Sequence, residues 1–137
     1  MANFWLLKSE PFVFSFQDLQ REGRTTWDGV RNYQARNFLR AMKLGDQCLF
    51  YHSNEGLAVV GVARVSREFF PDPTAETGDW SAVEVQPQQA LMRPVTLSEI
   101  KATPALQQIG LVRTPRLSVM PLAEAEYNLI LAMGEGR

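Results

Sequence analysis

TTWDGVRNYQARNFLRAMKLGD, residues 25–46, contains a helical pattern preceded by a cluster of polar and aromatic side chains. Its apolar residues recur at helical spacing, at Ala35, Phe38, Leu39 and Met42. This spacing places them on one face of a helix, and Gly45 follows as a stop signal. The preceding cluster, residues 27–34, brings together an aromatic ring, an acid, a glycine and several planar hydrogen-bonding groups. A helix start does not need such a set, so the segment predicts a helix that is entered from a candidate binding loop.

Short strand and helix patterns flank this segment on both sides. Strands are predicted at residues 4–7, 47–53, 57–66, 80–86 and 116–121. Further short helices are predicted at residues 15–23, 97–102 and 123–131. The elements do not alternate regularly as strand, helix, strand. An α+β domain with a small, partly closed β-barrel is therefore favoured over a doubly wound sheet.

Glycine and proline mark three special points along the chain. Pro11 restricts Glu10 to extended geometry, so the chain is expected to leave the sheet there. Gly61 interrupts the strand at 57–66 and indicates either a bulge or the close approach of another part of the protein. The proline-punctuated segment 69–79 is read as a lid or as a long connection.

The composition is that of an ordinary globular domain, with 45% hydrophobic residues, 21% charged residues and a net charge of −1. A single domain over residues 1–137 is the simplest interpretation. No run of about 18 apolar residues exists, so no membrane-spanning segment is expected. The first residues lack the layout of a signal peptide. The single cysteine, Cys48, allows no intrachain disulfide and suits a reducing compartment, so a cytoplasmic location is predicted.

The sequence offers no recognisable cofactor or metal motif. Cys48 and His52 are the only cysteine and histidine, which excludes the usual zinc sites. Neither a GxxxxGKS-type phosphate loop nor a GxGxxG motif is present. Cys48 itself has apolar neighbours in a strand and is expected to be buried and inert. No metal and no cofactor is therefore predicted.

Basic residues are concentrated in two segments of this near-neutral chain. Residues 24–43 carry five basic residues and one acid, and residues 93–116 carry four basic residues and one acid. If the fold brings the two segments together, they could contact phosphate groups locally. The alternative is that both are solvated faces without a partner.

Polar side chains interrupt the apolar pattern at four places. They are residues 8–10, 27–34, 52–54 and 113–118. Each place is a strand end or a junction between a strand and a helix, where barrels usually carry binding loops.

These side chains match the needs of a flat heteroaromatic ligand. Trp27 or Tyr33 could stack on a ring face, an interaction worth ~1–3 kcal/mol per base. Glu10 or Asp28 could accept a hydrogen bond from an exocyclic amine. Edge-reading groups are available at Asn32, Ser53, Asn54 and beside Gly29. Side chains for phosphate contacts at the rim are Lys8, Arg31, Arg36 and Arg113.

A purely structural role is open for several of the same residues. Trp27 is equally read as a core residue, and Trp80 as either core or a lip of the site. Asp28 could be a turn residue before a glycine. His52 and Ser118 could be packed or alternating strand residues without any chemical role.

Six motifs together resemble one known family, the EVE domain. They are WLLKSEP (5–11), WDGVRNYQARNFLRAMKLGD (27–46), FYHSN (50–54), FPDPTA (70–75), PVTLSEIKA (94–102) and LVRTPRLSVMPL (111–122). The resemblance runs from about Asn3 to Gly134. It implies a PUA-like fold, which is a small mixed β-barrel with surrounding short helices, related to YTH and ASCH domains. It also implies a module that reads modified nucleobases, chiefly modified cytosines or adenines, in an aromatic-lined pocket.

The resemblance also implies where the ligand would bind. Matched by motif, the pocket residues are Lys8, Ser9, Glu10, Trp27, Asp28, Gly29, Val30, Arg31, Asn32, His52, Ser53, Asn54, Arg116, Leu117 and Ser118, with Tyr33 added as a stacking ring. The expected partner is DNA or RNA that carries a modified base, and no catalytic residue is assigned.

Two other functions remain open on the sequence. A cofactor-free enzyme acting on a nucleobase or nucleotide would need an acid–base pair, and only Glu10 with His52, or Lys8 with Glu10, could supply one. A protein-interaction domain would need an exposed apolar patch. The base-binding module explains the 27–34 cluster best, because one surface has to stack on a ring while another reads its edge.

Overall fold

The computed structural model describes residues 3–136 as a mixed α+β fold built on one sheet. The strands are β1 (Phe4–Ser9), β2 (Thr25–Trp27), β3 (Gln47–His52), β4 (Ala58–Pro71), β5 (Ser81–Thr96) and β6 (Val119–Leu122). The helices are α1 (Phe16–Glu22), α2 (Tyr33–Ala41), α3 (Leu97–Lys101), the 3₁₀ turn η1 (Pro104–Leu106), α4 (Gly110–Arg113) and α5 (Glu124–Gly134). None of the helices in this described part is long and apolar enough to cross a membrane.

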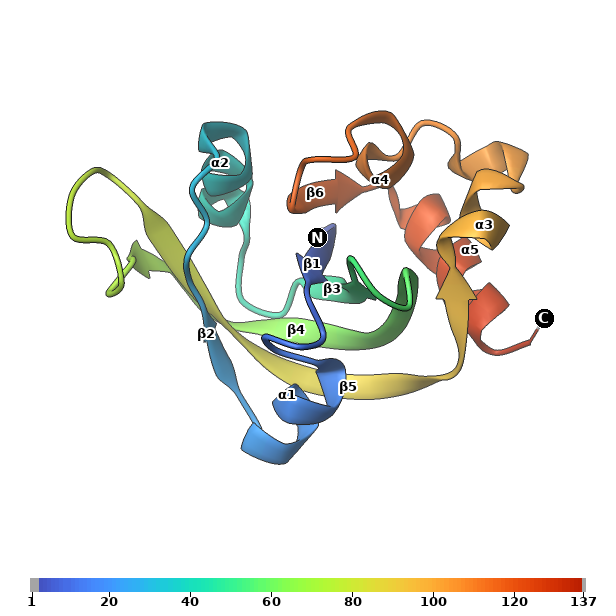
Figure 1. The fold of residues 1–137 in the computed structure, drawn as a ribbon, viewed down its shortest axis with the longest axis horizontal. Helices are drawn as coiled ribbons and strands as arrows, with labels where there is room; N and C mark the ends of the chain where they lie inside the picture. Colours follow the sequence, from blue (N-terminus) through green and yellow to red (C-terminus); the bar gives the residue numbers. More distant parts are fainter. Residues whose placement is uncertain (1–2, 137) are drawn as a thin grey trace.

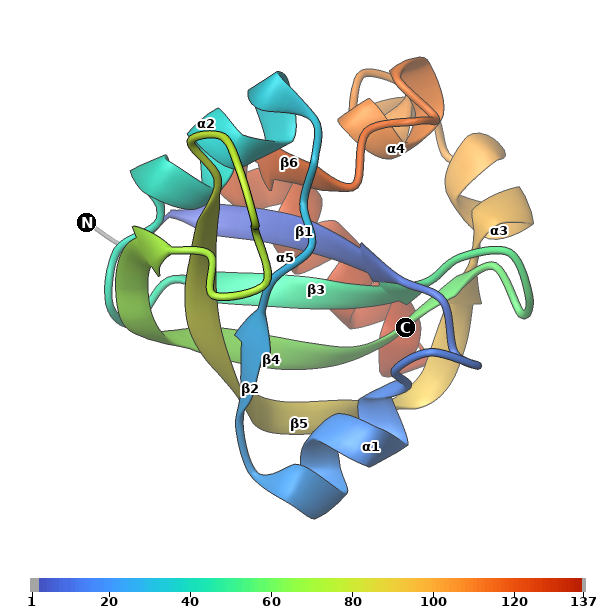
Figure 2. The same ribbon diagram turned by 60° about the vertical axis from the view of Figure 1, so that its left-hand side comes forward.

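The sheet has the strand order β2-β5-β4-β3-β1-β6 (Figures 1 and 2). β1 pairs with β3 in parallel, and the other neighbouring strands pair antiparallel. Register shifts interrupt the pairing of β4 with both of its neighbours, and such irregularities bend strands and increase the local twist. The long hairpin of β4 and β5 curves strongly, with short helices around it (Figure 1). This arrangement confirms the α+β fold class.

The structure differs from the sequence prediction mainly at element ends. β5 continues to Thr96 instead of ending near Gln86, because its exposed second half pairs with β4 although it lacks a strand-like alternation of apolar residues. β2 was not predicted, since three residues are too few to show a period. η1 and α4 were also missed. β6 starts at Val119 rather than Arg116, because a turn closed by the Leu117 amide on the Thr114 carbonyl oxygen (3.0 Å) precedes it.

A buried carboxylate connects the first strand with the turn before β3. Asp46 is 1% exposed and accepts hydrogen bonds from the Trp5 indole, the Lys43 amide and the Asn3 amide, each at 3.0 Å. Burial of a charge is favourable only when donors satisfy it, and three donors do so here. Trp5 is 4% exposed and belongs to the hydrophobic core.

Gly61 lies where a helix side chain approaches the sheet closely. A Cβ atom at this position would be 2.4–2.6 Å from ring atoms of Phe16 on α1. The register of β4 also shifts between Val59 and Gly61. Both the bulge and the close approach expected from the sequence are therefore confirmed.

We expect the substitution Gly61→Ala to lower the free energy of unfolding by about 1–3 kcal/mol, because overpacking a closed core displaces its neighbours. Alanine normally improves a strand over glycine, so a loss reports the Phe16 contact rather than strand propensity. Urea unfolding measures the effect, and the double variant with Phe16→Leu should lose less than the sum of the single changes. A Gly61→Ala protein as stable as wild type would contradict this account.

Candidate functional site

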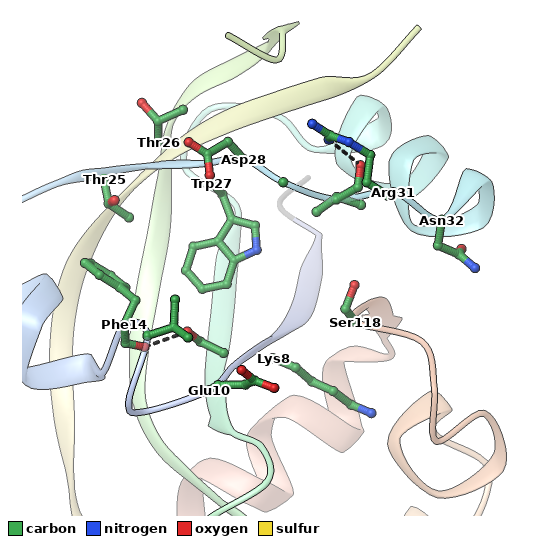
Figure 3. Close-up of a pocket in the computed structure, with 14 residues that line it drawn as sticks. Lys8, Glu10, Phe14, Thr25, Thr26, Trp27, Asp28, Arg31, Asn32 and Ser118 are labelled. Carbon is green, nitrogen blue, oxygen red and sulfur yellow. Dashed lines mark hydrogen bonds between the residues drawn. The ribbon is translucent and has the colours of Figure 1, made fainter. Parts of the chain in front are cut away.

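A cavity of about 480 Å³ opens at the end of β1, beside β2 and the loop that follows it (Figure 3). Its lining consists of Lys8, Ser9, Glu10, Val13, Phe14, Thr25, Thr26, Trp27, Asp28, Gly29, Val30, Arg31, Asn32 and Ser118. The volume lies within the range of roughly 300–1,000 Å³ that is typical of small-molecule sites. Three segments distant in sequence therefore converge on one cavity.

The chain leaves β1 in a tight turn that forms one side of the cavity. The amides of Val13 and Phe14 both donate to the Glu10 carbonyl oxygen at 2.9 Å, and the Ser9 hydroxyl donates to the Phe14 carbonyl oxygen. Pro11 prevents the strand from continuing, as its position in the sequence predicted. The turn carries the ring of Phe14 to the cavity wall (Figure 3).

Trp27 forms both core and cavity wall. Its ring packs edge-on against Phe50 with centroids 5.5 Å apart and planes at 86°, and only 9% of the residue is exposed. The two roles that the sequence left as alternatives are thus combined. The indole N–H donates to no other residue between 3 and 136 and is not sealed from solvent, so it remains available as a donor.

The loop at residues 28–32 is fastened by one carboxylate on the connection between β4 and β5. Asp72 accepts from the Gly29 amide at 2.8 Å and from the Arg31 guanidinium at 2.9 Å. It also accepts from the amide and the hydroxyl of Thr74, both at 2.7 Å. Gly29 adopts φ +76°, a left-handed conformation that disfavours other residues. At the end of the loop, the Asn32 side chain caps α2 by accepting from the Ala35 amide at 2.9 Å.

The two acids of this region, Asp72 and Asp28, have pKa values shifted in opposite directions. Burial would raise the pKa of Asp72, but hydrogen bonds from Thr74, Arg31 and Gly29 outweigh it and lower the pKa to about 2. In contrast, burial and then the nearby Asp72 charge raise the pKa of Asp28 above its ordinary value. Among the described residues, only its own backbone amide donates to the Asp28 carboxylate. Asp28 therefore keeps acceptor capacity that no other residue in the described part of the chain uses.

The other charged groups of the cavity already have protein partners. Glu10 accepts a short hydrogen bond from the Asn54 side-chain amide. Lys8 donates to the Pro115 carbonyl oxygen at 2.6 Å, and burial lowers the pKa of its ammonium group. The Lys8 contact holds the end of β1 against the 113–118 segment, and the Glu10 contact joins it to the turn after β3.

Ten of the residues expected in the site line the cavity, and six do not. The ten are Lys8, Ser9, Glu10, Trp27, Asp28, Gly29, Val30, Arg31, Asn32 and Ser118. The six are Tyr33, His52, Ser53, Asn54, Arg116 and Leu117. Leu117 is a buried core residue, whereas Arg116 is exposed on the turn before β6. Tyr33 points outward and stacks on Trp80 instead.

The residues at the end of β3 do not line the cavity but hold the segments that do. The Ser53 amide donates to the Ser9 carbonyl oxygen at 2.9 Å, and Asn54 holds Glu10. His52 Nε2 accepts from the Phe16 amide at 3.1 Å, and burial lowers the pKa of the imidazole. His52 thus caps the start of α1 as a neutral side chain.

Two of the three arginines expected at a phosphate rim, Arg36 and Arg113, lie outside the cavity lining and have different surroundings. Arg36 is only 16% exposed and donates to the Asn37 side chain and to the Asp79 carbonyl oxygen. Arg113 is exposed on α4 and donates to the Gln108 side chain.

Four residues of the cavity wall were not predicted from the sequence. Val13 and Phe14 follow the Pro11 turn, and the apolar sequence FVF (12–14) next to a predicted strand end was the available signal. Thr25 and Thr26 belong to β2, the strand that was not predicted.

Neither acid–base pair considered for an enzyme is assembled. Among the described residues, no ion pair joins Lys8 to Glu10, and their side chains bond to Pro115 and Asn54 instead. His52 lies outside the cavity lining, with Nε2 occupied by a backbone amide. Within residues 3–136, no three of the histidine, cysteine and acidic side chains gather as a metal site.

Comparison with known proteins assigns the chain to a family. The sequence model described as EVE domain matches residues 3–133. The chain belongs to the EVE domain family. A protein from Agrobacterium tumefaciens of known crystal structure is 47% identical to this EVE domain and superimposes with a TM-score of 0.95, covering 97% of this chain and 93% of that one.

Animal relatives are nearly as similar over the whole EVE domain. Thymocyte nuclear protein 1 of Mus musculus is 39% identical over 98% of this chain and 75% of its own length. The crystal structure of human THYN1 protein in complex with 5-methylcytosine containing DNA is 35% identical, with a TM-score of 0.90 and coverage of 98% of both chains. A remote likeness to ASCH from Zymomonas mobilis, with a TM-score of 0.60 at 13% identity, concerns the fold alone and agrees with a PUA-like architecture.

The name of the animal relatives corrects one prediction. Thymocyte nuclear protein 1 is named for the nucleus, which contradicts the cytoplasmic location inferred from the sequence. The inference failed because a lone buried cysteine indicates only a reducing environment, and nuclei share that property with the cytosol.

The Asp72 anchor predicts a specific acid transition of the loop at 28–32. The folded-state pKa of about 2 lies below the ordinary 3.8, so the carboxylate's stabilising effect is complete above about pH 4 and is lost as the pH falls through 2. In an NMR titration, we expect the Gly29 amide proton to shift with a midpoint near pH 2.

The substitution Asp72→Asn should abolish that shift and lower the free energy of unfolding by about 1.5–3 kcal/mol, as expected for lost hydrogen bonds to a charged group. The matched control is Glu99→Gln, because hydrogen bonds from Arg93 and Thr96 lower the pKa of Glu99 to about 2 at a separate place. A Gly29 shift that disappears in Glu99→Gln, or that survives in Asp72→Asn, would refute the assignment to Asp72.

Proposed function

We propose that this EVE domain binds DNA that carries 5-methylcytosine and takes the modified base into the cavity beside Trp27. The observation that carries the proposal is its likeness to human THYN1, whose structure was solved with 5-methylcytosine containing DNA. The cavity supports it by providing a concave site of suitable volume where the EVE motifs converge. The proposal favours cytosine over adenine and DNA over RNA among the ligands that the sequence allowed.

The polar groups of the cavity match the edge of cytosine. Cytosine offers an amine donor at N4, whereas thymine carries a carbonyl acceptor at the same position. The unused Asp28 carboxylate would accept from that amine and repel the thymine carbonyl. The available indole N–H of Trp27 and the Asn32 amide, whose oxygen alone is used in capping, could donate to the acceptors of the ring.

The apolar side of the cavity suits the flat faces and the methyl group of the base. Phe14, Trp27 and Val30 line it together with Val13. Base–aromatic stacking is worth about 1–3 kcal/mol per base and depends little on base identity. Extrusion from a duplex costs a few kcal/mol, so the stacking and edge contacts together must exceed this cost.

Binding of free nucleosides tests the proposal directly. The affinity for 5-methyldeoxycytidine should exceed that for deoxycytidine by roughly 10- to 200-fold, the discrimination available from one methyl group in a fitting apolar pocket. Thymidine carries the same methyl group but has a different hydrogen-bonding edge, so it separates recognition of the methyl group from recognition of the edge. Titrations followed by NMR shifts measure all three, and equal affinities for the three nucleosides would reject the proposed function.

Asp28 is expected to carry the distinction between 5-methylcytosine and thymine. The substitution Asp28→Asn keeps the size of the side chain but exchanges a charged acceptor for an amide. Affinity for 5-methyldeoxycytidine should fall about 10- to 150-fold, matching a charged hydrogen bond of about 1.5–3 kcal/mol. The preference over thymidine should narrow as well, because an amide can donate to the thymine carbonyl.

The matched control is Asp79→Asn, which removes the same charge from an acid that is 80% exposed and lies outside the cavity lining. Its nucleoside affinities should stay at the wild-type values. An Asp28→Asn protein with unchanged discrimination would show that another group reads the edge.

A further inference from the structure

A second aromatic surface lies beside the cavity but does not belong to it. Tyr33, the first residue of α2, stacks on Trp80, the residue before β5, with ring centroids 5.0 Å apart and planes at 18°. Tyr33 is nevertheless 65% exposed, so this contact covers only part of the ring. Neither residue is among those that line the cavity.

The positions of the neighbouring cations show that one face of Tyr33 is open. The Arg36 guanidinium lies 5.0 Å from the Tyr33 centroid and 5.9 Å from that of Trp80. A group on the outer face of Tyr33 would be much farther from Trp80 than from Tyr33, so Arg36 does not cover that face. Trp80 therefore occupies one face of Tyr33, and the other face meets solvent.

The stacked pair is held in place before any ligand arrives. Gly78, at φ +90°, lies so close to Trp80 that a Cβ there would be 2.7 Å from the indole nitrogen. Arg36 is fixed by hydrogen bonds to the Asp79 carbonyl oxygen at 3.1 Å and to the Asn37 side chain. A ring that is ordered in advance loses little conformational freedom on stacking, which favours binding.

Arg31 makes the pair continuous with the cavity. Its side chain belongs to the cavity lining, and its guanidinium lies 5.5 Å from the Trp80 centroid. Tyr33 is also separated from the cavity residue Asn32 by a single peptide bond. A strand whose base enters the cavity would consequently pass the open face of Tyr33.

We infer that the open face of Tyr33 stacks on the nucleobase next to the one in the cavity, so that the domain holds two successive nucleotides. The inference rests on the proposed function, because it places the second base relative to the first. The ring faces of all bases are similar, so this second position should accept any base.

The contribution of this second position should be stacking rather than phosphate attraction. Arg36 and Arg40 share Asp79, and Arg31 contacts Asp72, so two acids offset two of the three nearby positive charges. Neutralised cations release few counterions from nucleic acid. The loss of Tyr33 should therefore lower the affinity by the same factor at every salt concentration.

The experiment compares 5-methyldeoxycytidine with a single-stranded trinucleotide that carries 5-methylcytosine in its centre. Wild-type protein should bind the trinucleotide more tightly than the nucleoside. The substitution Tyr33→Ala should weaken trinucleotide binding by roughly 5- to 150-fold, the range for one stacked base, and leave nucleoside binding unchanged. Tyr33→Phe keeps the ring and should retain the wild-type affinity for both ligands.

An abasic position on either side of the central nucleotide identifies the stacked neighbour. With wild-type protein, one of the two abasic trinucleotides should lose the gain in affinity that the intact trinucleotide has over the nucleoside. The Tyr33→Ala protein should bind that abasic trinucleotide no worse than the intact one. The slope of log affinity against log salt concentration should be equal for wild type and Tyr33→Ala.

The outcomes separate this inference from the proposed function. The stacking site is overturned if the Tyr33→Ala protein keeps the full gain in affinity for the trinucleotide, or if it loses this gain with an altered slope of log affinity against log salt concentration. In both cases, nucleoside binding would still support the proposed function. Wild-type protein that binds neither ligand overturns both. A Tyr33→Ala protein with lowered nucleoside affinity shows that Tyr33 acts through the cavity and also contradicts the inference.

Discussion

The carboxylate of Asp72 determines whether the cavity has a rim. It joins the Gly29 amide and the Arg31 guanidinium to the connection between β4 and β5, across more than 40 positions of sequence. The contact exists only because β4 extends to Pro71, far enough to bring Asp72 beside β2. The geometry of the 28–32 loop therefore depends on the strong curvature of that hairpin. The geometry of this contact is specific because three kinds of donor surround a single buried carboxylate.

The wall of the cavity is rigid for a related reason. Trp27 belongs to the hydrophobic core through Phe50, and Phe50 in turn packs against Phe16 with ring centroids 5.3 Å apart. A ring that is locked on its inner side presents a fixed surface on its outer side. The protein thereby avoids the loss of side-chain freedom that a flexible surface aromatic would suffer on binding. The close contact of Phe16 with Gly61 extends the same rigid layer to β4.

The parts that could be predicted from the sequence are those encoded by local patterns. The helix after Asn32, the Pro11 turn and the Gly61 approach follow from spacing and backbone restrictions, and the motifs include ten of the fourteen residues that line the cavity. The buried anchor Asp72 carried no local signal, because the sequence FPDPTA is equally consistent with an exposed turn. Tyr33 lies outside the cavity lining although helix start and cavity wall are adjacent in sequence, because the first turn of α2 directs its ring toward Trp80. The second half of β5 is strand through its pairing with β4, which no property of QPQQALMRP reveals.

The position of β1 between β3 and β6 has a consequence for how the protein is made. β1 is the first strand of the sheet in sequence and β6 the last, and the Lys8 amide donates to the Ser118 carbonyl oxygen at 3.0 Å. During synthesis, one edge of β1 stays without its partner until nearly the whole domain has left the ribosome. Contacts of such long sequence separation make folding slow and leave an open strand edge exposed to neighbouring chains. The cavity therefore forms late, and a nascent chain that ends before Ser118 lacks one of its walls.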